Sequence, residues 1–176
     1  AVHDDLLAIQ RAIYLRKHGA GPLGFFMTTI RRQAASSLHG LVPFLEDILT
    51  RRLSDLELVE IDDDALEHGD DEIDAIRGEI AAIVERARAL PNDDPKLAAL
   101  LDIVTQKGGM PNRRLLVFSS FRHTLFYLDQ ALRQRGVRVG LIHGGIADDD
   151  RRALRKAFAL PPDHANAIDI LLSSEV

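Results

Sequence analysis

The sequence predicts an α/β fold, in which a parallel β-sheet with flanking helices is preceded by an all-helical segment. Three observations support this prediction. Apolar residues recur at helical spacing through most of residues 1–90. From residue 96 onward, short apolar runs alternate with further helical patterns. The loop PNDDP (91–95) separates the two patterns, so we place the boundary between a helical domain (1–91) and an α/β domain (92–176) there.

The predicted helical domain contains helices over 4–17, 23–34, 38–53 and 73–90. The third helix gathers its apolar residues on one face, as a helix packed against a core does: Leu38, Leu41, Val42, Leu45, Ile48 and Leu49. The pair Ser36-Ser37 stands directly before it and is a typical N-cap. Pro91 ends the last helix, because proline cannot continue one.

An acidic segment lies within this half, since residues 55–74 hold 11 acidic and no basic side chains. Blocks of like charge repel and extend the chain, so one interpretation is a solvated linker. The other is an acidic docking or autoinhibitory segment. The run Asp62-Asp63-Asp64 lacks the alternating ligands and the glycine of a calcium loop, and the histidines form no zinc pattern. We therefore predict no metal site.

The α/β domain is predicted to alternate helices and strands. Helices cover 96–106, 124–135 and 148–158. Strands cover 114–118, 137–143 and 168–172. The first strand is a continuous apolar run, as in a strand buried on both faces. The strand–helix–strand–helix–strand order implies a parallel sheet with right-handed crossovers.

Composition narrows the class of protein. The chain has no cysteine, which excludes a disulfide framework and a cysteine-ligated metal. No apolar stretch approaches the roughly 20 residues of a membrane span, and no basic segment opens a signal peptide, so we expect a cytoplasmic protein. Residues 1–91 hold 10 basic and 17 acidic side chains, and residues 92–176 hold 12 and 10. This balance of charges excludes a uniformly basic nucleic-acid binder and is compatible with a local basic face.

The candidate site lies where the predicted strands end, because open parallel sheets bind ligands beyond the carboxyl ends of their strands. The residues that we expect to gather there are Ser119, Phe121, Arg122, His143, Gly144, Ser173 and Ser174. Hydroxyls, small residues and backbone N–H groups suit phosphate oxygens, so a phosphodiester backbone is one natural partner. Taken singly, serines after strands are often helix caps and Gly-Gly is often a turn.

The helix at 148–158 offers a second basic surface, formed by Arg151, Arg152, Arg155 and Lys156. Contact with phosphates and a merely solvated surface are both open interpretations. The sequence contains neither a G-x-x-x-x-G-K-[ST] phosphate loop nor a G-x-S-x-G nucleophile elbow. We therefore predict no catalytic residue within these 176 residues.

Three segments in order resemble a known family: LLVFSSFRHTLFYLDQAL, GVRVGLIHGGIADDDRRALRKAFA and IDILLSSEV. Together they are similar to the C-terminal RecA-like (P-loop NTPase-type) helicase lobe of superfamily 2 ATPases, and most to bacterial Swi/Snf-type helicases. The resemblance covers about residues 96–176. VFSSF (117–121) is similar to motif IV of the family, and LLSSEV (171–176) is similar to the opening of motif V.

The resemblance implies a fragment of an ATP-dependent DNA helicase or translocase, with DNA preferred over RNA. ATP and Mg²⁺ would bind mainly to an N-terminal RecA-like lobe of the same parent, which would be a partner of this lobe. Ser119, Phe121, Arg122, His143 and Gly144 would lie near the nucleic-acid track. Ser173 and Ser174 would couple that track to the ATP cleft.

The resemblance further implies that the chain lacks the rest of motif V and the motif VI arginines, so we expect no ATP hydrolysis by the chain alone. It also implies an uncovered sheet edge, open to self-association or to the helices of 1–90. A competing hypothesis is a non-catalytic protein-interaction module, in which the acidic helical half docks a partner and the RecA-like part is a scaffold. A Rossmann-type enzyme fits the strand order and lacks the dinucleotide fingerprint.

Overall fold

The computed structural model describes residues 22–50, 77–89 and 94–174. The chain divides into two compact units, residues 1–92 and 93–176, and each is described by itself. The predicted helix over 4–17 and the acidic segment 55–74 lie outside the described residues. No helix in the described ranges has the length and apolarity needed to cross a membrane.

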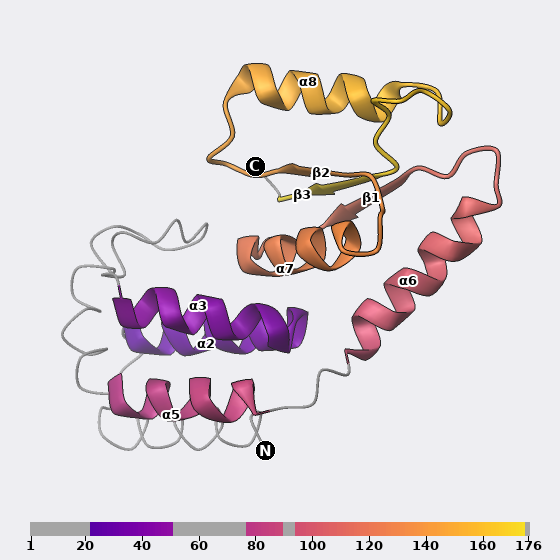
Figure 1. Ribbon diagram of the computed structural model, residues 1–176. Helices are drawn as coiled ribbons and strands as arrows, with labels where there is room; N and C mark the ends of the chain where they lie inside the picture. The colour runs from indigo at the N-terminus through magenta and orange to yellow at the C-terminus, as the bar shows by residue number, and fades with distance from the viewer. Residues whose placement is uncertain (1–21, 51–76, 90–93, 175–176) are drawn as a thin grey trace. The chain divides into compact units, whose positions relative to one another are not determined.

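The first unit contains helices α2 (Pro22–Ser36), α3 (Leu38–Thr50) and α5 (Arg77–Arg88), which confirms the predicted helices that fall on described residues (Figure 1). Ser37 separates α2 from α3. Its Oγ accepts the Gly40 N–H at 3.1 Å, so Ser37 is the N-cap of α3. The helices bury apolar side chains that are at most 2% exposed, namely Ile30, Leu41, Phe44, Leu45, Ile48, Ile80 and Ile83.

The second unit alternates helices and strands in the predicted order. Its elements are α6 (Pro95–Gly108), β1 (Leu115–Phe118), α7 (Arg122–Arg133), β2 (Val139–Ile142), α8 (Asp148–Ala159) and β3 (Ile170–Ser173). Asp94 begins α6, because its side chain accepts the N–H groups of Lys96 and Leu97 at 2.9 and 3.1 Å. Pro95 follows at the first helical position, where its missing N–H costs nothing.

The three strands form a parallel sheet in the order β1-β3-β2, so the last strand along the chain lies in the centre. Helix α7 lies on one face of the sheet and α8 on the other (Figure 1). The chain crosses the sheet in one direction through α7 and returns through α8. Because both the direction and the face are reversed, the two crossovers have the same hand, as parallel sheets require. The structure confirms the predicted α/β class with a parallel sheet and flanking helices.

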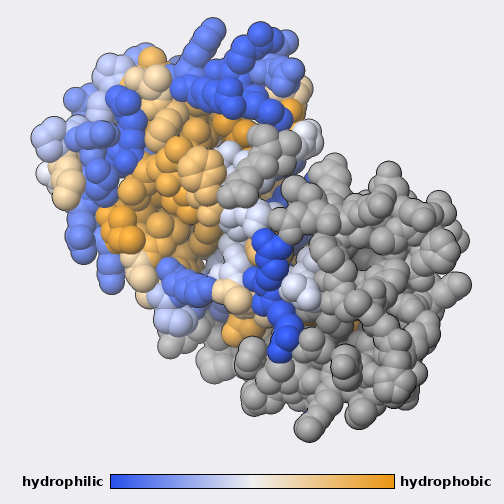
Figure 2. Space-filling model, turned by 180° about the vertical axis from the view of Figure 1, so that it is seen from behind, coloured by the Kyte–Doolittle hydropathy of each residue, from blue (hydrophilic) through white to orange (hydrophobic). Residues whose placement is uncertain are grey.

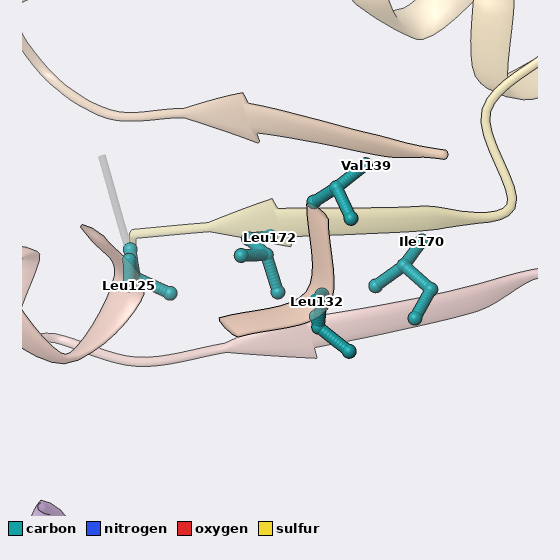
Figure 3. Close-up of a cluster of buried hydrophobic side chains, with 5 residues drawn as sticks. All are labelled: Leu125, Leu132, Val139, Ile170 and Leu172. Carbon is teal, nitrogen blue, oxygen red and sulfur yellow. The ribbon is translucent and has the colours of Figure 1, made fainter. Parts of the chain in front are cut away.

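The core of the second unit lies between the sheet and α7 (Figure 3). Five side chains at most 5% exposed form it: Leu125, Leu132, Val139, Ile170 and Leu172. Helix α6 adds Leu100, Leu101 and Val104 to the rim of this cluster. On the opposite face α8 approaches the sheet closely. A Cβ added at Gly140 would lie 2.9 Å from Ile168 Cδ1 and 3.3 Å from Leu154 Cδ2, so only glycine fits there without displacing a neighbour.

Strand β1 is buried on one face alone, and the prediction that it is buried on both faces is wrong. Leu115 and Val117 pack against the core, whereas Leu116 and Phe118 are 49% and 59% exposed. Side chains alternate between the faces of a strand, and on this face α8 packs mainly against β2 rather than β1. Figure 2 shows a broad hydrophobic area among the described residues on the face that is in view.

An ion-pair network joins the amino ends of the strands. The Asp169 carboxylate, just before β3, accepts from Arg113 Nε at 3.1 Å and from Arg138 Nε and Nη2 at 2.8 and 2.7 Å. Both arginines also donate to the Pro162 carbonyl, at 2.6 and 2.7 Å. The hydrogen bond from Arg138, opposed in part by burial, lowers the pKa of Asp169. The network ties the starts of β1, β2 and β3 to the loop before β3.

Candidate nucleic-acid interface

The carboxyl ends of the three strands lie in one row. Phe118, Ser173 and Ile142 are aligned across β1, β3 and β2. Beyond this row the Ser119 N–H donates to the Ser173 carbonyl, and the Ser174 N–H donates to the Ile142 carbonyl, each at 3.1 Å. The register therefore brings together the segments after each strand that the sequence marked as candidates.

This row lies at the point where the chain changes faces. The segment after β1 leads to α7 on one face of the sheet, and the segment after β2 leads to α8 on the other (Figure 1). The end of β3 lies between them. Open α/β sheets bind ligands outside the carboxyl ends of their strands at such a switch point. The topology thus places the candidate residues where this class of fold carries its ligands.

The turn between β1 and α7 is closed by a serine. Ser119 Oγ accepts the Phe121 N–H at 3.1 Å, which leaves its own O–H able to donate. Phe121 is the N-cap residue of α7 and caps it with no side-chain hydrogen bond, and Arg122 is the first helical residue. A helix N-terminus carrying a guanidinium favours an anion, so this turn has the electrostatics of a phosphate contact.

A hydrogen bond to the His143 side chain stabilises the turn between β2 and α8. His143 Nδ1 accepts the Gly145 N–H at 3.1 Å, and Gly144 and Gly145 are exposed. The His143 ring meets the Phe126 ring of α7 edge to face, with centroids 5.4 Å apart and planes at 67°. The Arg122 guanidinium lies over the same Phe126 ring, 5.5 Å from its centroid. Two candidates from different strand ends therefore converge on one aromatic ring.

Phe126 lies beside two of the candidates, and it is not among the residues predicted from the sequence. The pattern of α7 turns Leu125, Leu128 and Leu132 toward the sheet, which leaves Phe126 on the outward side, where it is 41% exposed. A large aromatic residue on the polar side of an amphipathic helix is the signal that identifies it. Phe126 is therefore a surface residue of the carboxyl edge and not part of the core.

The two serines after β3 differ in exposure. Ser173 is half-buried, and its Oγ donates to the Ser174 carbonyl at 3.1 Å. Ser174 is 7% exposed, and its Oγ has no hydrogen-bond partner in the described part of the chain. Leaving a buried hydroxyl unpaired costs about 1–3 kcal/mol. Ser173 and the turns after β1 and β2 thus form the accessible part of the edge, and Ser174 lies beneath it.

Half of the basic residues of α8 are engaged in local contacts. Arg151 Nη2 makes long contacts to the His143 and Ile146 carbonyls, at 3.4 and 3.5 Å. Arg152 pairs with Asp149 at 2.6 Å. Arg155 and Lys156 are exposed, so they are the two side chains of this set available to a phosphate.

The described strand ends do not fit the triphosphate of ATP. The turn at 119–121 contains no glycine that would let its backbone wrap a phosphate. The first turn of α8 carries Asp148, Asp149 and Asp150, which repel one. Among the described residues, no three metal-ligating side chains gather. We therefore assign no step of ATP hydrolysis to these residues.

A stretch of 71 residues of the chain is 32% identical to ATP-dependent RNA helicase DBP3 of Chaetomium globosum. It covers 40% of this chain and 12% of that helicase. This stretch is helicase-like. No protein-family model matches the chain. No solved structure matches it either.

The similarity supports a helicase-like segment in general and does not single out the Swi/Snf type or DNA. Because the match spans only 12% of the helicase, the activity of a whole helicase does not follow from it.

Proposed function

We propose that the chain supplies part of the C-terminal motor lobe of an ATP-dependent helicase or translocase, and that the carboxyl edge of its sheet contacts a nucleic-acid backbone. One observation carries the proposal. The β1-β3-β2 register places Ser174 beside the segments that begin at Ser119 and His143, at the switch point of the fold. The similarity to a helicase supports it independently.

The chemistry of the edge suits backbone contact rather than base readout. Its donors are backbone N–H groups, the Ser119 hydroxyl and the Arg122 guanidinium, which pair with phosphate oxygens of any sequence. Arg155 and Lys156 extend the positive charge along α8. These three cations correspond to about three neutralised phosphates. Each neutralised phosphate lowers the logarithm of the binding constant by about 0.7–0.9 for every tenfold rise in salt concentration. The binding constant should therefore fall roughly 20- to 40-fold between 50 and 200 mM salt.

The finer proposal is a Swi/Snf-like motor that acts on DNA. The order of the three motif segments supports it. The relative in the comparison is named an RNA helicase, so RNA is the alternative polymer. ATP and Mg²⁺ would then be held mainly by an N-terminal lobe of the parent protein, because the described strand ends do not fit a triphosphate. The chain by itself should show no ATPase turnover above background in a coupled assay with added DNA, and turnover would contradict this assignment.

Fluorescence anisotropy with labelled single-stranded DNA and RNA of equal length tests the proposal. We expect weak binding with a clear salt slope and a preference for DNA. Arg122→Gln should weaken binding to all sequences and reduce the slope by about one phosphate. Arg135→Gln is the matched control, because it removes the same charge just beyond the other end of α7.

Equal affinities of the two variants would place the contact elsewhere. Absence of binding to either polymer at 50 mM salt would refute the proposal and favour the interaction module, whose acidic segment repels nucleic acid. A preference for RNA would refute the finer DNA assignment alone.

A further inference from the structure

We propose that Phe126 is a stacking platform for one nucleobase of a single strand, so that the lobe contacts a base as well as the backbone. The inference rests on the proposed function and adds a ligand group to the same edge. It begins from a cluster of three side chains, Arg122, Phe126 and His143, contributed by α7 and by the turn after β2.

The orientation of the Phe126 ring is set by two separate elements. Arg122 stands one helical turn earlier in α7 and lies over the ring, 5.5 Å from its centroid. His143 meets the ring at 67° from the β2 side and is itself held by the Gly145 N–H. A ring restrained from two sides loses little freedom when a ligand stacks on it, which favours binding.

Phe126 does not belong to the core of the second unit. Its neighbour Leu125 is fully buried, whereas Phe126 leaves 41% of its surface in contact with solvent. A smaller or polar residue at this outward position would leave the described core contacts unchanged, because the core of the second unit consists of other side chains. An aromatic surface between a guanidinium and an imidazole, at a ligand edge, has the features of a recognition site.

A nucleotide is the ligand whose two parts match this surface. The base presents a flat π-face to the ring, and the phosphate meets Arg122 and the N-terminus of α7. Gly144 and Gly145 are exposed beside His143, so the strand can approach the backbone there. In a duplex the bases are already stacked on one another. The platform therefore favours a single strand, without preference among bases.

Phe126→Leu is the decisive variant, because leucine keeps an apolar side chain at this position and removes the π-face. Stacking on an aromatic side chain changes affinity by about 5- to 150-fold per base, so we expect a loss in this range for single-stranded oligonucleotides. Phe126→Trp should retain or raise affinity. Phe118→Leu is the matched control, since it makes the same change at an exposed phenylalanine on the opposite face of the sheet. Circular dichroism of every variant verifies the fold.

The test uses the full chain with a labelled oligothymidylate, the same strand with abasic sites, and a strand containing 2-aminopurine. We expect Phe126→Leu to bind the normal strand more weakly than the wild type does, and to bind the abasic strand equally well. The wild type should quench the fluorescence of 2-aminopurine, and Phe126→Leu should not. If the wild type binds and Phe126→Leu binds equally well, the stacking inference fails while the proposed function stands. If the wild type binds neither DNA nor RNA, both fail. Binding of an acidic aromatic peptide instead would also overturn the inference.

Discussion

Replacing Asp169 by asparagine removes a negative charge that two arginines share at the amino end of the sheet. Asparagine keeps the size of the side chain. It turns one of the acceptor oxygens of the carboxylate into an NH₂ group, which cannot accept a hydrogen bond from an arginine. Three charge-assisted hydrogen bonds, at 2.7, 2.8 and 3.1 Å, are lost or weakened at once. The starts of all three strands are connected through this carboxylate, so the second unit should become less stable as a whole.

The magnitude follows from the exposure of the groups. The side chain of Asp169 is 22% exposed, and those of Arg113 and Arg138 are 33% and 31% exposed. Buried charge-assisted bonds contribute about 1.5–3 kcal/mol each, and fully exposed pairs contribute about 0.2–1 kcal/mol. At this intermediate exposure we expect Asp169→Asn to cost about 2 kcal/mol in total. For a unit of this size the melting temperature should fall by roughly 8–16 °C.

The dependence on pH has a definite sign. Hydrogen bonding to Arg138 lowers the pKa of Asp169 in the folded chain, below the value of about 3.9 in an unfolded chain. The unfolded state thus binds the proton first as the pH falls. The stabilisation is fully present above about pH 4 and is lost as the pH falls through the folded pKa. The difference between wild type and Asp169→Asn should therefore be largest near neutrality and should shrink in acid.

Thermal unfolding followed by circular dichroism at pH 7 and at about pH 3 measures this difference. Asp129→Asn is the control, because within the described ranges Asp129 pairs with Arg133 alone, in an i,i+4 contact worth about 0.5 kcal/mol or less. The reasoning is refuted if the two variants melt alike at pH 7, or if the deficit of Asp169→Asn is as large in acid as at neutral pH.

Three further predictions concern the second unit. Leu132→Ala empties a fully buried position in the core, so urea unfolding should show a loss of about 2–5 kcal/mol, and a loss below 1 kcal/mol would contradict the packing described. Gly140→Val places carbon atoms against Ile168 and Leu154, so the free energy of unfolding, measured in urea, should fall by about 1–3 kcal/mol. Gly108→Ala is the control, because Gly108 has open space around it and the substitution should leave the free energy of unfolding unchanged. Burial, with a smaller contribution from Asp94, raises the pKa of Tyr127 to about 12. In a Tyr14→Phe chain Tyr127 is the one remaining tyrosine, so alkaline absorbance titration should show its ionisation near that value. The free energy of unfolding should fall as the pH rises from about 10, where the tyrosine of the unfolded chain begins to ionise.

The parts of the fold that could be predicted are those with a local cause. The apolar run at Leu115–Phe118 and the spacing of Leu125, Leu128 and Leu132 identify a strand and a helix within their own segments. Parallel strands end at one edge for any strand order, so the gathering of Ser119, His143 and Ser173 followed from the alternation of elements alone.

The parts that escaped prediction depend on contacts between distant residues. The central position of β3 is a matter of long-range pairing, which no short pattern records. The Asp169 network joins residues up to 56 positions apart, and its arginines resemble ordinary surface charges in the sequence. The exposure of Leu116 and Phe118 depends on where α8 lies. For Phe126 the sequence holds a local signal, since an aromatic residue stands on the polar side of its helix. Its proximity to the candidate site depends on the contact with His143, 17 positions away along the chain, which the sequence does not show.

Amide chemical-shift mapping with a single-stranded oligonucleotide tests the central claim most directly, because it reports the contact surface residue by residue. The account predicts shifts at 119–122, 143–145 and 173–174, with the aromatic signals of Phe126 moving in the same titration. The amino end of the sheet, around Arg138 and Asp169, should stay unchanged. Shifts confined to that end, or no shifts at all, would contradict the assignment of the carboxyl edge as a nucleic-acid interface.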